Sequence, residues 1–192
     1  MNHYRSFSRI YDWAAKRMCE SCRPFIKKGS KILDIGTGSG IIAKNLGDYF
    51  ESEIIGVDVE DKRVVDVSFK IIDGKNLPFD DNEFDISFIS FVLHHTRNAE
   101  HLLKEAKRVS RDKIIIYEDL AEGFVSSFFC RIHGFLFDKF CQTGDNPAFF
   151  KSEKEWEELF NSLGLSIIFK KKLKSLYPVK KIQFVLTKES LP

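Results

Sequence analysis

The sequence predicts an α/β fold of the doubly wound type, in which helices cover both faces of a mostly parallel sheet. Segments with helix-type and strand-type apolar spacing alternate along the chain, and acidic or glycine-rich turns follow the first three predicted strands. Strands that alternate with helices form parallel sheets, because their crossovers place helices on the faces. With 192 residues the chain has room for one such domain, so residues 1–192 are interpreted as a single domain.

The individual elements follow from the spacing of apolar residues. Apolar residues recur every three or four positions in the predicted helices, which are residues 7–26, 39–50, 98–110 and 152–164. Short apolar runs mark the predicted strands, which are residues 31–35, 53–57, 67–72, 84–90, 112–118, 165–169 and 181–187. Ser152 and Glu155 have the spacing of a capping box at the start of the last helix. Residues 59–67 are too few for a full crossover helix.

The composition narrows the class of protein. Hydrophobic residues make up 43% and charged residues 30%, which is typical of globular proteins and excludes disorder. No apolar run approaches the ~20 residues of a membrane helix, so no membrane span is expected. The net charge of +2 argues neither for nor against nucleic acid, and no nucleic-acid partner is expected. Residues 1–19 lack the apolar core of a signal peptide, which favours a cytoplasmic location. The sequence does not indicate an oligomeric state.

The cysteines leave two interpretations open. Cys19 and Cys22 form a C-x-x-C pair, and His133 lies between Cys130 and Cys141. A zinc or redox site is one interpretation, although zinc sites usually have two close pairs. The other is that Cys19 and Cys22 are two small residues on one side of a helix. We predict no metal site.

The strongest signal for function is the glycine-rich turn over residues 36–40, between a predicted strand and a predicted helix. Alternate glycines let the backbone approach a ligand closely and expose N–H groups near a helix N-terminus. Asp58 ends the second strand and Asp73 follows the third. Open α/β sheets bind ligands at the carboxyl ends of their strands, where an acidic side chain can accept both hydroxyls of a ribose.

The spacing in this turn distinguishes between nucleotide ligands. Dinucleotide sites have G-x-G-x-x-G, but here the spacing is G-x-G-x-G and Ile41 replaces the last glycine of that pattern. Asp34 also precedes the turn. A carboxylate repels a pyrophosphate and attracts an ammonium group. S-adenosylmethionine has an ammonium and a sulfonium and no phosphate, so these residues favour it over NAD.

At these motifs the chain resembles the class I S-adenosylmethionine-dependent methyltransferases, in particular their ubiquinone/menaquinone-methyltransferase-like (type 11) branch. The resemblance covers about residues 30–118 and rests on the segments 33–40, 56–58, 73–79 and 84–95. It implies a Rossmann-like, seven-stranded sheet with an antiparallel last strand, and S-adenosyl-L-methionine as the cofactor. The connection over residues 59–67 is shorter than the family's usual crossover.

The resemblance also implies roles for single residues. The cofactor-binding residues would be Asp34, Gly36, Thr37, Gly38, Gly40, Asp58, Val59, Asp73, Gly74, Ser90 and Phe91. In the family pattern the residues up to Gly40 hold the methionyl part, and Asp58 holds the ribose hydroxyls. Val59, Asp73 and Gly74 serve the adenine, while Ser90 and Phe91, at the end of the fourth strand, border the methyl-transfer site.

Residues for acceptor chemistry are less clear from the sequence. His94 and His95 are candidate general bases, and Glu118 is a candidate for orienting an acceptor or taking a proton. The histidines are equally compatible with a structural role in this loop, and Glu118 with capping a helix. The lysines at 170–172 and 174 favour a solvated face over contact with an anionic acceptor.

Residues 120–150 are rich in phenylalanine, with apolar residues recurring every four positions. A helix packed on the core is one interpretation. The other is a helical lid inserted after the fifth strand, with Phe124, Phe128 and Phe129 facing an apolar acceptor. We therefore predict a methyltransferase for a small, partly apolar acceptor. The alternative is a non-catalytic protein that binds S-adenosylmethionine as a regulator or partner subunit.

Overall fold

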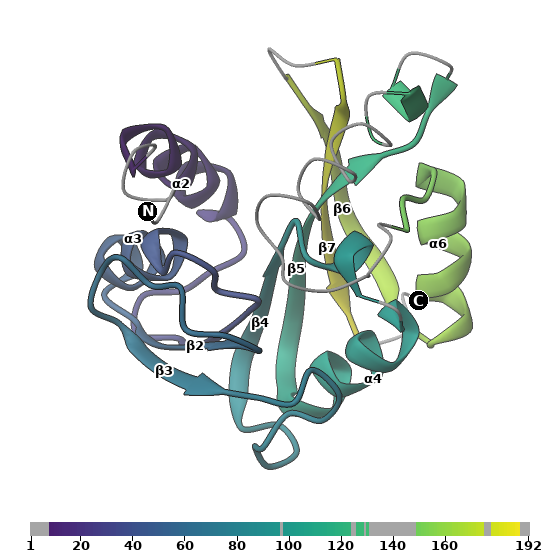
Figure 1. Cartoon of the computed structure of the whole chain (residues 1–192). Helices are drawn as coiled ribbons and strands as arrows, with labels where there is room; N and C mark the ends of the chain where they lie inside the picture. The colour runs from purple at the N-terminus through teal and green to yellow at the C-terminus, as the bar shows by residue number, and fades with distance from the viewer. Residues whose placement is uncertain are drawn as a thin grey trace. The chain divides into compact units, whose positions relative to one another are not determined.

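The fold is a seven-stranded sheet with the strand order β3-β2-β1-β4-β5-β7-β6 (Figure 1). This computed structural model describes residues 8–96, 98–123, 126–128, 130, 149–174 and 178–188. The strands are β1 Lys31–Ile35, β2 Glu53–Asp58, β3 Ser68–Ile71, β4 Phe84–Ser90, β5 Ser110–Leu120, β6 Ser166–Leu173 and β7 Lys180–Thr187. β2 runs parallel to β1 and β3, whereas β7 is antiparallel to β5 and β6. The predicted α/β class with an antiparallel last strand is confirmed.

The chain divides into two compact units. The first unit comprises Met1–Phe88 and Glu105–Asp112, and the second comprises Ile89–Lys104 and Lys113–Pro192. The helices, given in chain order, are α2 Ser8–Cys22, α3 Ile41–Phe50, the 3-10 helix η1 Leu93–His95, α4 Ala99–Val109 and α6 Glu153–Ser162. The interpretation of residues 1–192 as a single domain stays a prediction.

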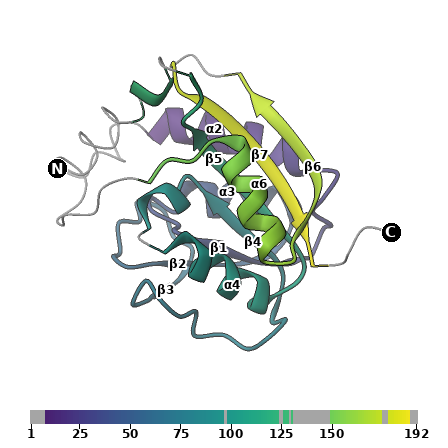
Figure 2. The same cartoon turned by 90° about the vertical axis from the view of Figure 1, so that its right-hand side faces the viewer.

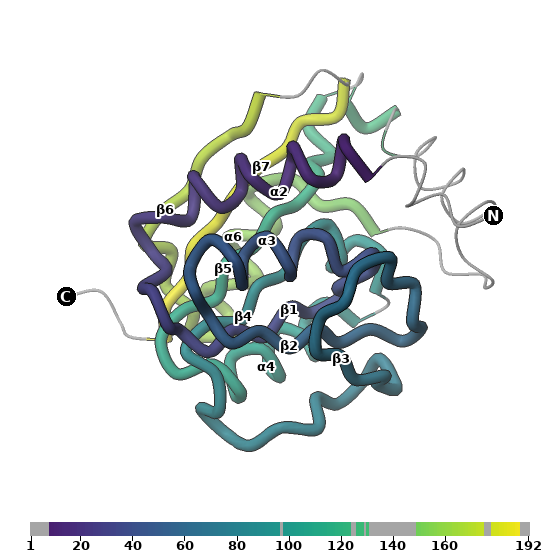
Figure 3. The backbone as a smooth tube through the Cα atoms, turned by 90° about the vertical axis from the view of Figure 1, so that its left-hand side faces the viewer, coloured from purple at the N-terminus to yellow at the C-terminus, as the bar shows by residue number. Residues whose placement is uncertain are grey.

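The first unit is built on β1, β2 and β3. Helix α2 packs against α3, and α3 packs against β2 (Figure 3). Leu33 on β1, Leu46 on α3 and Val57 on β2 have no exposed surface and form part of its core. The glycine-rich turn connects β1 to α3, so this packing fixes both ends of the turn.

The second unit contains most of β5 together with β6, β7 and α6. Helix α6 lies along β6 (Figure 2). Its start is the predicted capping box, since the Ser152 hydroxyl accepts from the Glu155 N–H and the Glu155 carboxylate accepts from the Ser152 N–H. On its inner side, Phe160 packs edge-on against Phe184 of β7 at 5.1 Å between ring centroids. The unit therefore has an aromatic core of its own.

The predicted lid over residues 120–150 lies largely outside the described residues, and so do Phe124 and Phe129. Phe128 is described and has 52% of its surface exposed. The lid stays a prediction. Among the helices of the described ranges, none is long and apolar enough to cross a membrane.

Candidate functional site

The turn between β1 and α3 requires glycine at three positions. Gly36, Gly38 and Gly40 have φ angles of 75°, 51° and 76°. Left-handed backbone of this kind costs an L-residue with a side chain roughly 1–2 kcal/mol, but costs glycine little. The alternate glycines in the sequence are therefore explained by the left-handed backbone conformation that the turn requires.

The N–H groups of this turn are already used within the protein. Those of Gly36 and Thr37 both donate to the Val57 carbonyl, and that of Gly40 donates to the Thr37 carbonyl. The Gly38 N–H donates to Asp58 Oδ2 at 2.9 Å. The expectation that the turn exposes its N–H groups is wrong for these four. A phosphate needs such donors, so the turn is poorly suited to one.

Asp34 lies beneath the turn with 2% of its surface exposed. Its Oδ2 accepts a hydrogen bond from the Thr37 hydroxyl at 2.5 Å. Burial raises the pKa of Asp34 to about 7; the Thr37 bond opposes this rise, and the charge of Asp58 adds to it. A cation would favour the ionised form, so this carboxyl suits a positively charged ligand.

A glycine on the neighbouring strand makes room for this arrangement. A Cβ on Gly56 would lie 2.7 Å from Thr37 Oγ1 and 2.9 Å from its Cβ. Such distances are below van der Waals contact, so only glycine lets Thr37 reach Asp34. The sequence analysis did not recognise this role of Gly56.

Asp58 ends β2, as predicted. Its Oδ1 accepts from the Val59 N–H at 2.7 Å, in addition to the Gly38 bond at Oδ2. Burial raises the pKa of Asp58, against the lowering effect of these backbone bonds. The Glu60 N–H also bonds to this carboxylate. A carboxylate has about four acceptor positions, so capacity for one further hydroxyl remains.

Asp73 and Gly74 lie beside the end of β2. The Ile72 N–H donates to the Asp58 carbonyl at 2.9 Å, and Val59 Cγ1 is 3.0 Å from where a Cβ on Gly74 would stand. Asp73 Oδ1 accepts from the N–H groups of Lys75 and Asn76, and these bonds lower its pKa. Val59 is 61% exposed. The structure thus brings the residues predicted for adenine together.

The short connection over residues 59–67 folds directly onto the glycine turn. The Val64 N–H donates to the Ser39 carbonyl at 3.0 Å, and Val65 and Val67 lie 3.2 and 3.1 Å from where a Cβ on Gly40 would stand. As expected, no helix forms within this described segment. Residues 59–67 therefore take the place of the family's usual crossover helix beside the turn.

In the second unit, Phe91 follows β4 with unusual backbone geometry. Its φ is +56°, and its N–H donates to the Tyr117 carbonyl at 2.8 Å. The Lys181 ammonium lies 4.4 Å from the centre of the Phe91 ring. Strained non-glycine residues of this kind concentrate at functional sites. Ser90 is the last residue of β4, as the sequence predicted.

Glu118 and His94 form a buried pair, with 0% and 1% of their surfaces exposed. His94 Nδ1 is 2.5 Å from Glu118 Oε2. Glu118 Oε1 accepts from the N–H groups of Val92 and Leu93, at 3.1 and 2.7 Å. The structure thus joins two candidates that the sequence gave separately. His95 is adjacent, with its ring centroid 4.0 Å from that of His94.

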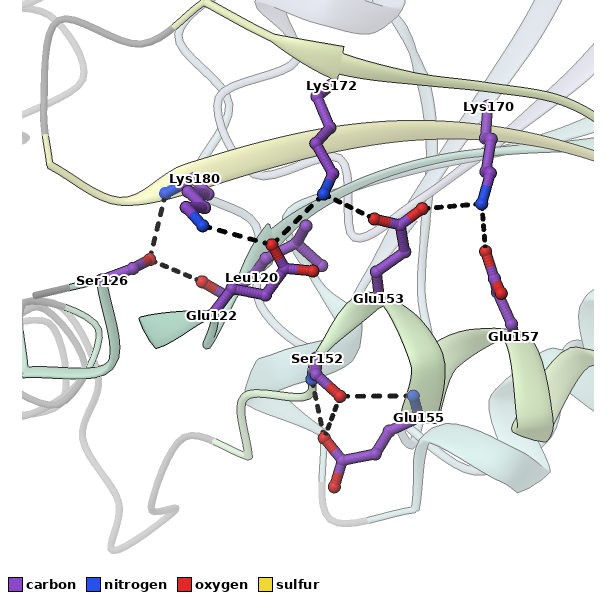
Figure 4. Close-up of polar contacts among 10 residues, drawn as sticks. All are labelled: Leu120, Glu122, Ser126, Ser152, Glu153, Glu155, Glu157, Lys170, Lys172 and Lys180. Atoms are coloured by element: carbon purple, nitrogen blue, oxygen red, sulfur yellow. Dashed lines mark hydrogen bonds and ion pairs between the residues drawn. The ribbon is translucent and has the colours of Figure 1, made fainter. Parts of the chain in front are cut away.

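Two lysines of β6 in the second unit form ion pairs with glutamates. Lys170 pairs with Glu153 and Glu157 at 2.7 and 2.6 Å, and Lys172 pairs with Glu153 and Glu122 at 2.8 and 3.3 Å (Figure 4). These two lysines are thus engaged by carboxylates, in line with a solvated face.

A cavity of about 250 Å³ lies beside α6 and is lined by Thr96, Asn98, Ala99, Glu100, Phe149, Lys151 and Leu159. Four of these seven side chains are polar. The cavity is also smaller than most ligand pockets, which enclose roughly 300–1,000 Å³. It does not fit an apolar acceptor.

The three cysteines in the described ranges show no sign of a metal or redox site. Cys19, Cys22 and Cys130 are buried and form no disulfide among the described residues. Burial raises the pKa of Cys19 to about 12 and that of Cys130 to about 11, which disfavours the thiolate. In the described ranges, no group of three or more His, Cys, Asp or Glu side chains is placed to hold a metal. Cys141 and His133 lie outside those ranges.

Known proteins match this chain over the same segments. A family model described as "Methyltransferase domain" matches residues 33–116. The demethylmenaquinone methyltransferase of Staphylococcus carnosus is 30% identical over 176 residues, which cover 84% of this chain and 70% of that protein. The chain belongs to the class I S-adenosylmethionine-dependent methyltransferases. Within them it is of the ubiquinone/menaquinone-methyltransferase-like type, and its cofactor is S-adenosylmethionine.

A second relative supports this membership, and a solved structure shares the fold. The demethylmenaquinone methyltransferase of Staphylococcus saprophyticus is 30% identical over 189 residues, covering 92% of this chain and 79% of that protein. The complex between the Haloferax volcanii Trm112 methyltransferase activator and a methyltransferase contains a similar fold. Its TM-score is 0.78 at 18% identity, with 99% of this chain and 94% of that chain covered.

The residues present fit S-adenosylmethionine. Two carboxyl groups, Asp34 and Asp58, are held at the turn with raised pKa values, while four N–H groups that a phosphate would need are occupied. This environment suits a cofactor that carries positive charge and no phosphate. It argues against NAD on grounds independent of the sequence spacing.

Proposed function

We propose that this methyltransferase acts on a small, partly apolar acceptor of the phenol or quinol type. The two Staphylococcus relatives are named for demethylmenaquinone, a quinone. Phe128 and Phe149 lie within the phenylalanine-rich residues 120–150 and have 52% and 46% of their surfaces exposed. These observations support an apolar acceptor beside the second unit's β4–η1 segment. The predicted cytoplasmic location stays a prediction.

The cofactor roles form part of the same proposal. The arrangement at Asp58 carries it, because its carboxylate accepts from three backbone N–H groups and keeps capacity for a ribose hydroxyl. Asp34 and the turn up to Gly40 would hold the methionyl part, with Val59 against the adenine and the Gly74 N–H serving its ring. Asp73 Oδ2 would accept from the adenine amino group. Replacing Asp73 with Ala should then reduce the preference for adenosyl over inosyl analogues in competition binding.

The acceptor proposal is tested by a screen for release of S-adenosylhomocysteine. The panel includes phenols, quinols, amines, lipids and RNA, each with the full-length protein and S-adenosylmethionine. We expect release with at least one phenol or quinol. Release only with an amine or RNA would contradict the proposed class. Cofactor binding without release for any acceptor would favour the non-catalytic alternative, which no observation on the described residues favours now.

A further inference from the structure

Helix α2 of the first unit carries two large apolar side chains on its exposed face. Ile10 is 62% exposed and Trp13 is 57% exposed. The other face of α2 packs against α3 (Figure 3) and includes the buried Cys22. Trp13 lies nine residues before Cys22, which is two and a half turns at 3.6 residues per turn, so the two side chains are on opposite sides of the helix. Trp13 therefore stands at the centre of the face that α2 turns away from α3.

Positive charge gathers in the same part of the chain. Residues 8–28 contain six Lys or Arg and two Asp or Glu, a net charge of +4, whereas the whole chain carries +2. Lys16 pairs with Asp12 and Lys28 pairs with Glu51. Four exposed basic side chains form no ion pair with any of the described residues: Arg9, Arg17, Arg23 and Lys27. This part of the first unit is therefore a basic surface whose charge is only partly neutralised.

Arg17 joins the apolar and the charged parts of this face. Its guanidinium carbon lies 5.0 Å from the centre of the Trp13 ring. A tryptophan ring is apolar in its body and polar at its N–H, and tryptophan is enriched at the headgroup level of membranes for this reason. A guanidinium group pairs with phosphate oxygens through two parallel hydrogen bonds. Together the two side chains match a surface that offers phosphate groups above hydrocarbon.

We propose that α2 docks this protein on the surface of an anionic membrane. Trp13 and Ile10 lie at the headgroup level, and the basic side chains around them contact lipid phosphates. The helix rests on the membrane without crossing it, because its buried face is engaged by α3. The use of such docking rests on the proposed function, since an acceptor of the quinol type dissolves in lipid. The docking itself requires neither cofactor nor acceptor, so vesicle binding by a protein that methylates no acceptor would contradict the proposed function and support the docking.

The competing occupant of this face is another protein. Trp and Arg are also enriched at the centres of protein interfaces. The cores of those interfaces, however, are depleted of charged residues, whereas four of the six exposed residues of α2 are charged. An anionic lipid surface attracts each Lys or Arg that comes near it. The surplus of positive charge over residues 8–28 therefore favours the membrane.

The first experiment is flotation of the full-length protein with lipid vesicles. One set contains phosphatidylcholine alone, and the other contains equal parts of phosphatidylcholine and phosphatidylglycerol. We expect binding to the anionic vesicles only and its loss in 1 M NaCl, because salt screens the attraction. Each basic residue near an anionic surface contributes about fivefold in affinity, so Arg17→Glu, which changes the charge by two, should lower the partition coefficient roughly 20-fold.

The matched control for this variant is Lys154→Glu. It makes the same change of charge at a side chain of α6 that is 85% exposed, and it should keep most of the binding. Equal losses in Arg17→Glu and Lys154→Glu would mean that net charge alone drives binding, which would overturn α2 as the docking surface. Failure of the wild type to bind the anionic vesicles would overturn it as well.

The second experiment uses the fluorescence of Trp13. The chain has two tryptophans and Trp156 is fully buried, so a shift caused by vesicles reports on Trp13. We expect the emission to move to shorter wavelength with anionic vesicles, and Trp13→Phe to abolish this shift. Ile10→Ala should weaken vesicle binding severalfold, whereas the control Ile71→Ala, at a side chain of β3 that is 61% exposed, should not. A shift that appears with rising protein concentration in the absence of lipid would assign this face to a protein contact and overturn the proposal.

Discussion

The glycine turn of the first unit and the β4–η1 segment of the second unit differ in whether their polar groups have hydrogen-bond partners within the chain. In the turn, the N–H groups of Gly36, Thr37, Gly38 and Gly40 all have partners within the chain. In the β4–η1 segment, a buried histidine nitrogen has none. The proposed cofactor region therefore has its N–H groups paired before a ligand binds, whereas the β4–η1 segment, where we propose that the acceptor binds, retains an unpaired polar group. Specificity for the acceptor would then depend on the second region, because a cofactor is shared by a family and an acceptor is not.

The largest effect is expected from breaking the buried pair of the second unit. Glu118→Ala leaves two backbone N–H groups and the His94 ring without their partner. Removing one member of a buried pair costs about 3–5 kcal/mol. Urea unfolding monitored by circular dichroism measures this loss. Glu100→Ala, which removes an exposed pair with Lys104, is the control and should change stability by less than about 0.5 kcal/mol. Equal stabilities of the two variants would show that the hydrogen bonds of Glu118 do not stabilise the folded chain.

A smaller effect is expected at the turn. Gly56→Ala places a methyl group 2.7 Å from Thr37 Oγ1, and overpacking of this kind costs about 1–3 kcal/mol. Because Thr37 must then move away from Asp34, binding of S-adenosylmethionine should weaken as well. Chemical unfolding and calorimetric titration measure the two effects. Unchanged stability and affinity would show that the turn is not tightly packed.

The buried carboxyl of the turn predicts a dependence of stability on pH. The pKa of Asp34 is about 7 in the folded chain, against an ordinary value of 3.8, so the folded state holds a proton that the unfolded state releases. The resulting stability is complete below pH 4 and is lost as the pH rises to about 7, by up to about 1.4 kcal/mol per pH unit.

Asp34→Asn lacks this titration, so its stability relative to the wild type should increase over that pH range and then level off. Unfolding of both proteins at pH 4 to 8 provides the measurement. A difference that stays constant with pH would show that Asp34 is ionised throughout.

The smallest effect is expected at the surface of the second unit. Lys170 is 48% exposed and pairs with two glutamates of α6. Exposed ion pairs contribute less than about 1 kcal/mol and are screened by salt. Lys170→Ala should therefore cost less than this in low salt and almost nothing in 1 M NaCl, as followed by thermal unfolding. A cost above 2 kcal/mol that resists salt would mean that the network is structural.

Local sequence patterns predicted those features that depend only on residues a few positions apart in the chain. The glycines of the turn, Asp58 at the end of β2 and the capping box at Ser152 all follow from requirements within a few residues. The seven-stranded sheet with an antiparallel last strand followed from the family resemblance. Boundaries shifted slightly, as in the fifth strand, which spans Ser110–Leu120 and not residues 112–118.

Contacts between distant residues could not be predicted in the same way. His94 and Glu118 are 24 residues apart, and neither residue's local pattern indicates the other as its partner. The same holds for Gly56 and Thr37, and for the Val64 N–H that occupies the Ser39 carbonyl. Such contacts depend on strand register and on how the short connection folds, which a single sequence does not encode in its spacing.

We propose that the turn of the first unit binds S-adenosylmethionine through Asp58. Isothermal titration calorimetry of the wild type, Asp58→Ala and a control variant tests this directly. The control is Asp48→Ala, which removes an exposed ion pair with Lys44. We expect the wild type and the control to bind equally, and Asp58→Ala to bind more weakly by about 1.5–3 kcal/mol, the range for hydrogen bonds to charged groups. Equal affinity of all three proteins, or binding of NAD in preference to S-adenosylmethionine, would contradict the account.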